Sequence, residues 1–184
     1  MQHEDFTIAL HEAGHGIVAA ALGRNVDRST ISITGGLTYV DVSWQDRGQA
    51  DDVGAILLAG QVAEALFAGA LRSGGSDEDN ERLANVAALS RQTDFTNFCW
   101  RCSTRAAVVL RTYQPQVHRV AADLLATGRV DASHASLAAI ARAFEISHSR
   151  GPLNCRRIAP PAIPRHGRRV ACVCNVALNG EPLR

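Results

Sequence analysis

Apolar side chains in the first 149 residues recur mainly every three or four positions, the spacing that places them on one face of an α-helix. The pattern predicts helices over residues 6–22, 51–69, 77–90, 104–112, 115–126 and 132–144. Cap residues mark some of the ends, because Gly23 follows the first segment and Asp51 or Asp52 can cap the second. Residues 92–103 lack this spacing, so we expect a loop there.

Residues 31–44 follow a different pattern, in which polar and apolar positions alternate. Ile31 opens one alternating run, a second run surrounds Tyr39, and the pair Gly35-Gly36 separates the two. Such runs around a glycine pair are typical of a β-hairpin, or of two strands joined by a short loop. We therefore expect a mainly α fold with one small β-hairpin.

The periodic pattern stops after residue 150. Residues 150–184 hold five of the six prolines in the chain, and seven arginines against Glu181 as their only acid. A stretch without periodic apolar positions has no face to bury. We expect one domain over residues 1–149 and a disordered Pro- and Arg-rich tail over residues 150–184.

Net charge, the length of apolar runs and the number of cysteines indicate where the protein is located and which partners it has. The net charge of +1 gives no reason to expect a nucleic-acid partner. No apolar run approaches the roughly 18 residues of a membrane span, and residues 1–5 are polar and acidic, unlike a signal peptide. Five cysteines, an odd number, do not indicate a disulfide framework. We therefore expect a cytoplasmic protein without a membrane span.

Cys99 and Cys102 form a Cys-x-x-Cys pair in the predicted loop. A structural zinc site would need a second pair, and the remaining cysteines fall in the predicted disordered tail. No thioredoxin-like pattern of strands and helices surrounds the pair. We expect incidental loop cysteines.

The stretch HEAGH, residues 11–15, carries the strongest chemical signal. His11 and His15 lie four positions apart in a helical segment, so both imidazoles can bind one zinc ion from the same face. Glu12 stands close enough to take a proton from a zinc-activated water as it attacks a peptide carbonyl. Two buried histidines and a glutamate are costly unless their polar atoms are satisfied, and a metal ion would satisfy them.

A catalytic zinc site also needs a third protein ligand and an open position. The sequence after His15 lacks the glycine and third histidine of the metzincin pattern, so the ligand must come from farther along the chain. The acidic candidates are Glu64, Asp77, Glu78, Asp79 and Glu81. Acids at the start of a helix also complement its dipole, whether or not one of them binds metal.

Three stretches resemble the peptidase domain of the FtsH family of ATP-dependent zinc metalloproteases. They are HEAGH, LLAGQVAEALFAG and SGGSDEDNERLANVAAL, in this order, and residues 117–140 echo the closing helices of that domain more weakly. The resemblance implies a zincin-like helical domain whose third zinc ligand is an aspartate of the last stretch. It also implies that Glu64 orients one of the histidines.

Two alignments of the last stretch place the ligand differently. Without a gap it falls on Glu78, and with one extra residue it falls on Asp79. We prefer Asp79, because the apolar residues after it then have the spacing of a buried helix face, while Asp77 remains an alternative. The preferred site is therefore Zn²⁺ bound by His11, His15 and Asp79, with Glu12 as the general base.

The FtsH family joins this peptidase domain to an ATPase module and a membrane anchor. The chain has no GxxxxGK[ST] phosphate-binding loop and contains no lysine. We expect a zinc-dependent metalloendopeptidase that acts on unfolded or flexible polypeptides, alone, after self-association or with a separate ATPase. The alternatives are a zinc-binding or interaction module of the same fold with little or no hydrolysis, and a helical partner-binding domain without metal.

Overall fold

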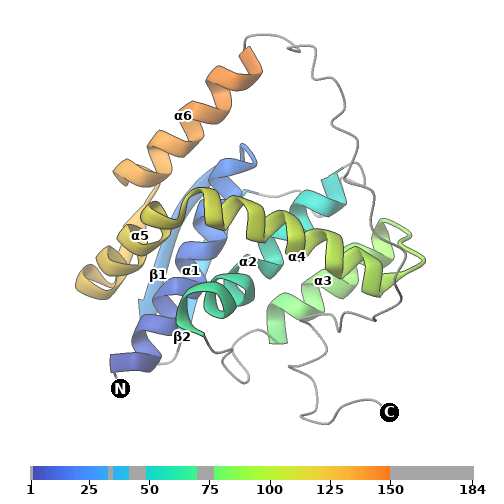
Figure 1. Cartoon of the computed structure of the whole chain (residues 1–184), viewed down its shortest axis with the longest axis horizontal. Helices are drawn as coiled ribbons and strands as arrows, with labels where there is room; N and C mark the ends of the chain where they lie inside the picture. Colours follow the sequence, from blue (N-terminus) through green and yellow to red (C-terminus); the bar gives the residue numbers. More distant parts are fainter. Residues whose placement is uncertain (1, 33–34, 42–48, 70–76, 150–184) are drawn as a thin grey trace.

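A computed structural model describes residues 2–32, 35–41, 49–69 and 77–149 (Figure 1). The elements are α1 (Gln2–Ala21), β1 (Val26–Ser32), β2 (Gly35–Val40), α2 (Ala50–Ala63), the π-helical turn η2 (Glu64–Ala68), α3 (Asp77–Leu89), α4 (Phe95–Thr112), α5 (Gln114–Thr127), β3 (Arg129–Asp131) and α6 (Ala135–Ser149). The mainly α prediction is confirmed. The predicted tail lies outside the described residues, and no described helix is both long and apolar enough to cross a membrane.

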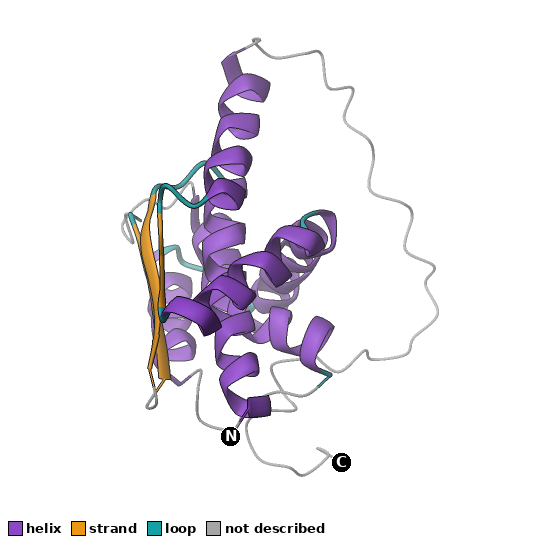
Figure 2. Cartoon of the chain, turned by 90° about the vertical axis from the view of Figure 1, so that its left-hand side faces the viewer, coloured by secondary structure: helices purple, strands orange, loops and turns teal. Residues whose placement is uncertain are grey.

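The described strands form one antiparallel sheet in the order β2-β1-β3, which lies as a layer along one side of the helices (Figure 2). The predicted β-hairpin is confirmed, with Thr30 opposite Leu37, but Gly35 and Gly36 lie within β2, opposite Ser32 and Ile31, and do not separate the strands as predicted. The third strand was not predicted, because three residues are too short to show an alternating pattern. Gly128 ends α5 with φ 74° and turns the chain so that Val130 pairs with Ser29.

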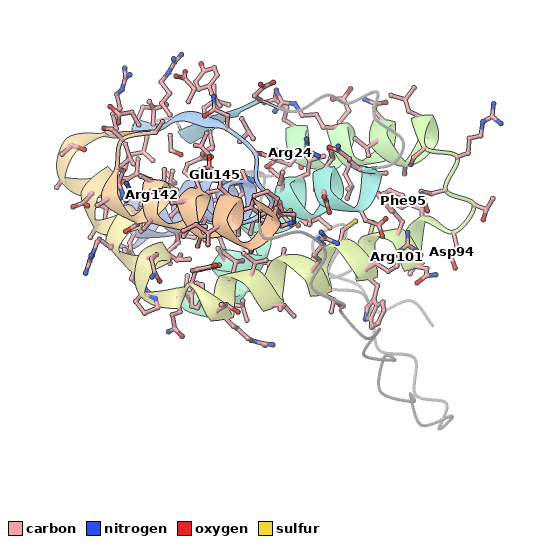
Figure 3. All side chains as sticks on the ribbon, turned by 90° about the horizontal axis from the view of Figure 1, so that it is seen from above. Arg24, Asp94, Phe95, Arg101, Arg142 and Glu145 are labelled. Carbon is pink, nitrogen blue, oxygen red and sulfur yellow. The ribbon has the colours of Figure 1, made fainter. Side chains whose placement is uncertain are left out.

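The prediction of a loop over residues 92–103 is wrong. Helix α4 begins at Phe95, and Asp94 caps it by accepting a hydrogen bond from the Asn97 amide at 2.9 Å (Figure 3). The buried face of α4 is formed by Phe98, Cys99, Cys102, Ala106 and Leu110. Thr96, Asn97 and Arg101 stand among the apolar residues of this stretch, and its helical spacing was therefore missed.

Cys99 and Cys102 are therefore helical core residues, and the prediction of loop cysteines is wrong. The thiol of Cys102 packs so closely on α2 that a Cβ added at Gly54 would lie 2.5 Å from its sulfur. Burial raises the pKa of the Cys102 thiol to about 12. A thiol with such a pKa stays protonated at neutral pH, so packing accounts for this residue.

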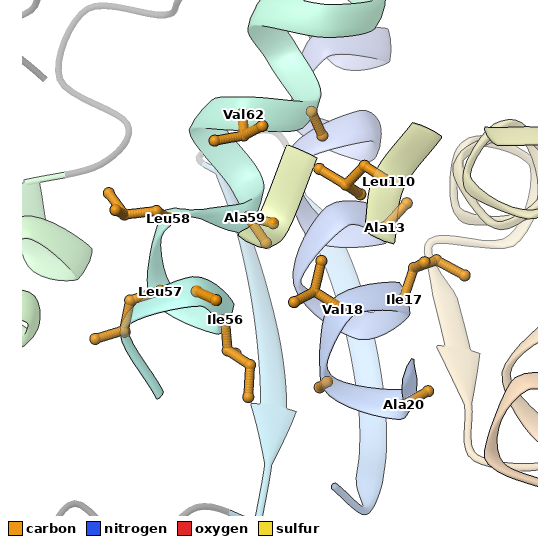
Figure 4. Packing of buried hydrophobic residues seen from close by; sticks show 14 of the residues in the cluster. Ala13, Ile17, Val18, Ala20, Ile56, Leu57, Leu58, Ala59, Val62 and Leu110 are labelled. Atoms are coloured by element: carbon orange, nitrogen blue, oxygen red, sulfur yellow. The ribbon is translucent and has the colours of Figure 1, made fainter. Parts of the chain in front are cut away.

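Helix α1 lies at the centre of the fold, in contact with α2, α5 and the first two strands. Its side chains interdigitate with those of α2 and α4 in the core, as Ala13, Val18, Ala59 and Leu110 illustrate (Figure 4). The two backbones of α1 and α2 approach closely, since a Cβ added at Gly14 would lie 2.6 Å from the Ala59 carbonyl oxygen. This close crossing brings the start of α1 beside the end of α2.

Candidate metal centre

Helix α1 buries all three residues of the HEAGH motif that carry chemistry. His11, Glu12 and His15 are 4%, 5% and 7% exposed. The two imidazoles lie one helical turn apart and meet edge to face, with ring centroids 4.7 Å from each other. The local geometry of a helix suffices for this arrangement, because positions four apart share a face.

Neighbouring groups fix the orientation of both rings. Nδ1 of His11 donates to the Glu64 carboxylate at 2.7 Å, and Nδ1 of His15 donates to the Ile56 carbonyl at 2.7 Å. Because a carbonyl oxygen can only accept, Nδ1 of His15 carries a hydrogen, and Nε2 is the ring nitrogen that can bind a metal ion. Both Nε2 atoms consequently face the same point in front of α1, as in metal sites where a second group orients each histidine.

Asp79 lies at that point. Its Oδ2 is 3.3 Å from Nε2 of His11 and 3.3 Å from Nε2 of His15. Ligand atoms about 2.0–2.1 Å from a tetrahedral zinc ion are separated by about 3.3–3.4 Å, so these two separations fit. The three side chains together form a group that could hold a metal ion, with all ligand atoms within 4.8 Å of one another.

The other candidate acids of α3 are exposed, namely Asp77, Glu78 and Glu81. Glu78 forms an ion pair with Arg82 one turn along the helix. Asp79 instead faces the histidines, because Gln61 of α2 donates to the neighbouring Asn80 at 2.9 Å and docks this turn of α3 on α2. The structure thus brings Asp79, rather than Asp77 or Glu78, to both imidazoles.

Charges in this group compensate one another in the metal-free protein. Burial by itself would lower the pKa of His11, but its hydrogen bonds with Asp79 and Glu64 outweigh that effect and raise the pKa to about 9. Burial likewise opposes ionisation of Asp79, yet the imidazoles of His11 and His15 hold the pKa of its carboxyl well below the usual range. An ionised Asp79 and a protonated His11 thus share one buried site, and a metal cation would replace the proton on His11.

Two glycines make room for the reactive side chains. A Cβ added at Gly60 on α2 would lie 2.4 Å from Nε2 of His11, and one added at Gly36 on β2 would lie 2.4 Å from Cγ of Glu12. Contacts this short exclude a larger residue unless the histidine or the glutamate moves. Neither position was predicted as part of the site, because only the fold shows which backbone comes so close.

The site opens into a cleft of about 530 Å³ between α1, α2, α3 and β2. Its floor carries His11, Glu12 and His15, and the start of α3 forms one wall. Residues Gly36, Leu37, Thr38, Tyr39, Val40 and Asp41 form the opposite wall. Strand β2 is therefore next to the candidate metal site.

No protein-family model matches the chain, and no curated protein matches its sequence. The fold and site define a mainly α protein with a small antiparallel sheet and a buried His-His-Asp group that could hold a metal ion.

Proposed function

We propose that the protein is a zinc-dependent metalloendopeptidase that hydrolyses unfolded or flexible polypeptides, with a peptidase domain of the FtsH type. One observation carries the proposal: Asp79 lies 3.3 Å from Nε2 of both His11 and His15, in a cleft that Glu12 also lines. Two imidazole nitrogens and one carboxylate oxygen form a ligand set of catalytic zinc sites, which keep a fourth position open.

A zinc ion held by His11, His15 and Asp79 would act as a Lewis acid that makes water more acidic and polarises a carbonyl. Glu12 would accept a proton from the water that attacks the scissile carbonyl carbon. The same proton would then pass from Glu12 to the amide nitrogen as the carbon–nitrogen bond breaks. The products are a carboxylic acid and an amine, and Glu12 returns to its starting state.

Strand β2 offers a place for the substrate backbone. Within the described sheet it is an edge strand that pairs only with β1, and its residues line the cleft. An extended polypeptide can add to such an edge through main-chain hydrogen bonds, and the exposed Leu37 and Tyr39 are available to its side chains. Only a flexible or unfolded segment can take up this conformation, which supports the proposed substrate class.

The FtsH resemblance gains support from the way its motifs meet in space. His11 of the first motif contacts Glu64 of the second at 2.7 Å and Asp79 of the third at 3.3 Å. The three stretches are far apart in sequence, so their convergence on one site is not a consequence of local structure. Association with a separate ATPase, or with further copies of the chain, is part of the same proposal.

Metal analysis and a peptidase assay test the proposal together. We expect one zinc per chain in the wild-type protein, loss of that zinc in His11→Ala, and cleavage of casein or a flexible fluorogenic peptide. Glu12→Gln should keep the zinc and lose the cleavage, whereas Glu145→Gln on α6, outside the cleft, should retain both. Equal cleavage by wild type and Glu12→Gln would overturn the catalytic assignment of Glu12. Zinc binding by the wild-type protein without any cleavage would favour a metal-binding module without hydrolysis.

A further inference from the structure

The sheet contacts the proposed general base directly. Oγ1 of Thr38 on β2 lies 2.7 Å from Oε2 of Glu12, 3.1 Å from the Glu12 main-chain oxygen and 2.9 Å from Oγ of Ser29. A hydroxyl has a single proton to donate, and a charged carboxylate at the shortest distance is the strongest of the three acceptors. Thr38 therefore donates to Glu12.

Ser29 completes the arrangement from the neighbouring strand. Its side chain is fully buried, on β1 opposite Thr38, and the described residues give its hydroxyl Thr38 Oγ1 as a partner. Since the Thr38 proton is engaged by Glu12, Ser29 donates to the Thr38 oxygen. The two hydroxyls form a chain that ends on one oxygen of the Glu12 carboxylate, and such chains strengthen each bond by polarisation.

Gly36 holds the carboxylate from a second side. A Cβ added at this residue would lie 2.6 Å from Oε1 of Glu12 and 2.4 Å from its Cγ. The bare backbone of β2 thus packs against Glu12 while Thr38 binds Oε2. Oε1, which packs against Gly36, is therefore the oxygen without the Thr38 hydrogen bond.

We propose that Thr38, supported by Ser29, is a positioning residue that fixes the Glu12 carboxylate for proton transfer. The role of Thr38 in proton transfer rests on the proposed peptidase function. The hydrogen bond between Thr38 and Glu12 is present in the protein without metal. It links two roles of β2, since the strand expected to pair with substrate also aligns the base. A substrate segment that pairs along β2 would order the strand that carries Thr38.

Three variants test this role. Thr38→Val keeps the shape and removes the hydroxyl, Thr38→Ser restores a hydroxyl, and Thr30→Val serves as the matched control. Thr30 lies on the same sheet and donates to the Leu37 carbonyl at 3.3 Å, but it does not line the cleft. Orienting groups of this kind typically contribute about 10–100-fold to activity.

We expect Thr38→Val to lower kcat by about 10–100-fold while KM stays within about twofold and the zinc content is unchanged. Thr38→Ser should recover most of the loss, and Thr30→Val should match wild type. A merely structural role for Thr38 would instead change stability or metal content and leave no rescue specific to a hydroxyl. Unchanged kcat in Thr38→Val would overturn the inference.

A crystal structure of metal-free Thr38→Val provides a readout without activity. The Glu12 carboxylate should leave its wild-type position next to β2, and an unmoved carboxylate would contradict the inference even if kcat fell. If wild type proves inactive, the proposed peptidase function fails, but this comparison still decides whether Thr38 positions Glu12. Should Thr38→Val not fold, Ser29→Ala tests the same chain, with a smaller fall in kcat and a weaker shift of the carboxylate expected.

Discussion

Gly60→Ala is the sharpest test of how the fold positions the candidate metal centre. The added Cβ would lie 2.4 Å from Nε2 of His11 and 2.5 Å from its Cδ2 and Cε1 atoms. Ordinary contacts begin at 3.4 Å, so the imidazole must move by about 1 Å. Metal sites tolerate only about 0.2 Å in their bond lengths, so we expect zinc affinity to fall on the order of 100-fold.

Stability should change far less than metal affinity in this variant. Overpacking a core typically costs about 1–3 kcal/mol, while alanine is favoured over glycine in a helix by about 1 kcal/mol. The net loss of about 0–2 kcal/mol corresponds to a decrease in Tm of at most about 8 °C for a chain of this size. Thermal unfolding of the metal-free protein measures this change in stability separately from the change in metal affinity.

Gly54→Ala is the matched control on the same helix. Its added Cβ would lie 2.5 Å from the Cys102 sulfur and 3.0 Å from the Phe98 ring, so it overpacks the core without touching the histidines. Competition with a chromophoric chelator should show wild-type zinc affinity for Gly54→Ala and a large loss for Gly60→Ala. Wild-type affinity in Gly60→Ala would refute the position assigned to His11.

Three further predictions concern the metal ligands and the core thiol. Asp79→Asn should lower zinc affinity by at least tenfold in the same chelator assay. Asp77→Asn, two residues away and exposed, should leave the affinity unchanged. Equal effects of the two substitutions would mean that Asp79 is not the ligand. Glu64→Gln keeps the size of the side chain but removes the charge next to His11, and we expect about tenfold weaker zinc binding with the fold retained. Because the Cys102 thiol is buried and its pKa is about 12, its native alkylation rate at pH 7 to 9 should stay far below that of an ordinary thiol, whose pKa is about 8.5. Peptide mapping of the native and the unfolded protein measures this rate, and rapid native labelling at pH 8 would show that the thiol is not buried.

The sequence predicted the parts of the site that depend on local geometry. The face shared by His11 and His15 follows from helical spacing, and the pairing of β1 with β2 follows from alternation around the glycine pair. Asp79 was a preference among three acids, because its approach to α1 depends on how α3 docks on α2. The hydrogen bond of Gln61 with Asn80, which holds this docking, has no signature in sequence.

Other contributors to the site could not have been found from residue types. The Ile56 carbonyl that orients His15 is a main-chain atom, and every residue has one. Thr38 and Gly36 belong to the site because β2 packs against α1 at Glu12. Hydrophobic patterning does not show which elements pack together. The start of α4 was missed for a similar reason. Its buried face is defined by packing against α2, which the sequence pattern does not show.

The convergence of α1 and α3 has a consequence for how the protein unfolds. Helix α3 is anchored by few buried side chains, Leu83, Val86 and Ala87, whereas α1 is buried along most of its length. A metal ion shared by His11 and Asp79 would be a reversible cross-link between segments 68 residues apart. Metal at 100 times its Kd would add about 2.7 kcal/mol to the folded state. Metal occupancy would then set the rate of amide hydrogen exchange in α3, and the ion would hold this wall of the cleft next to α1.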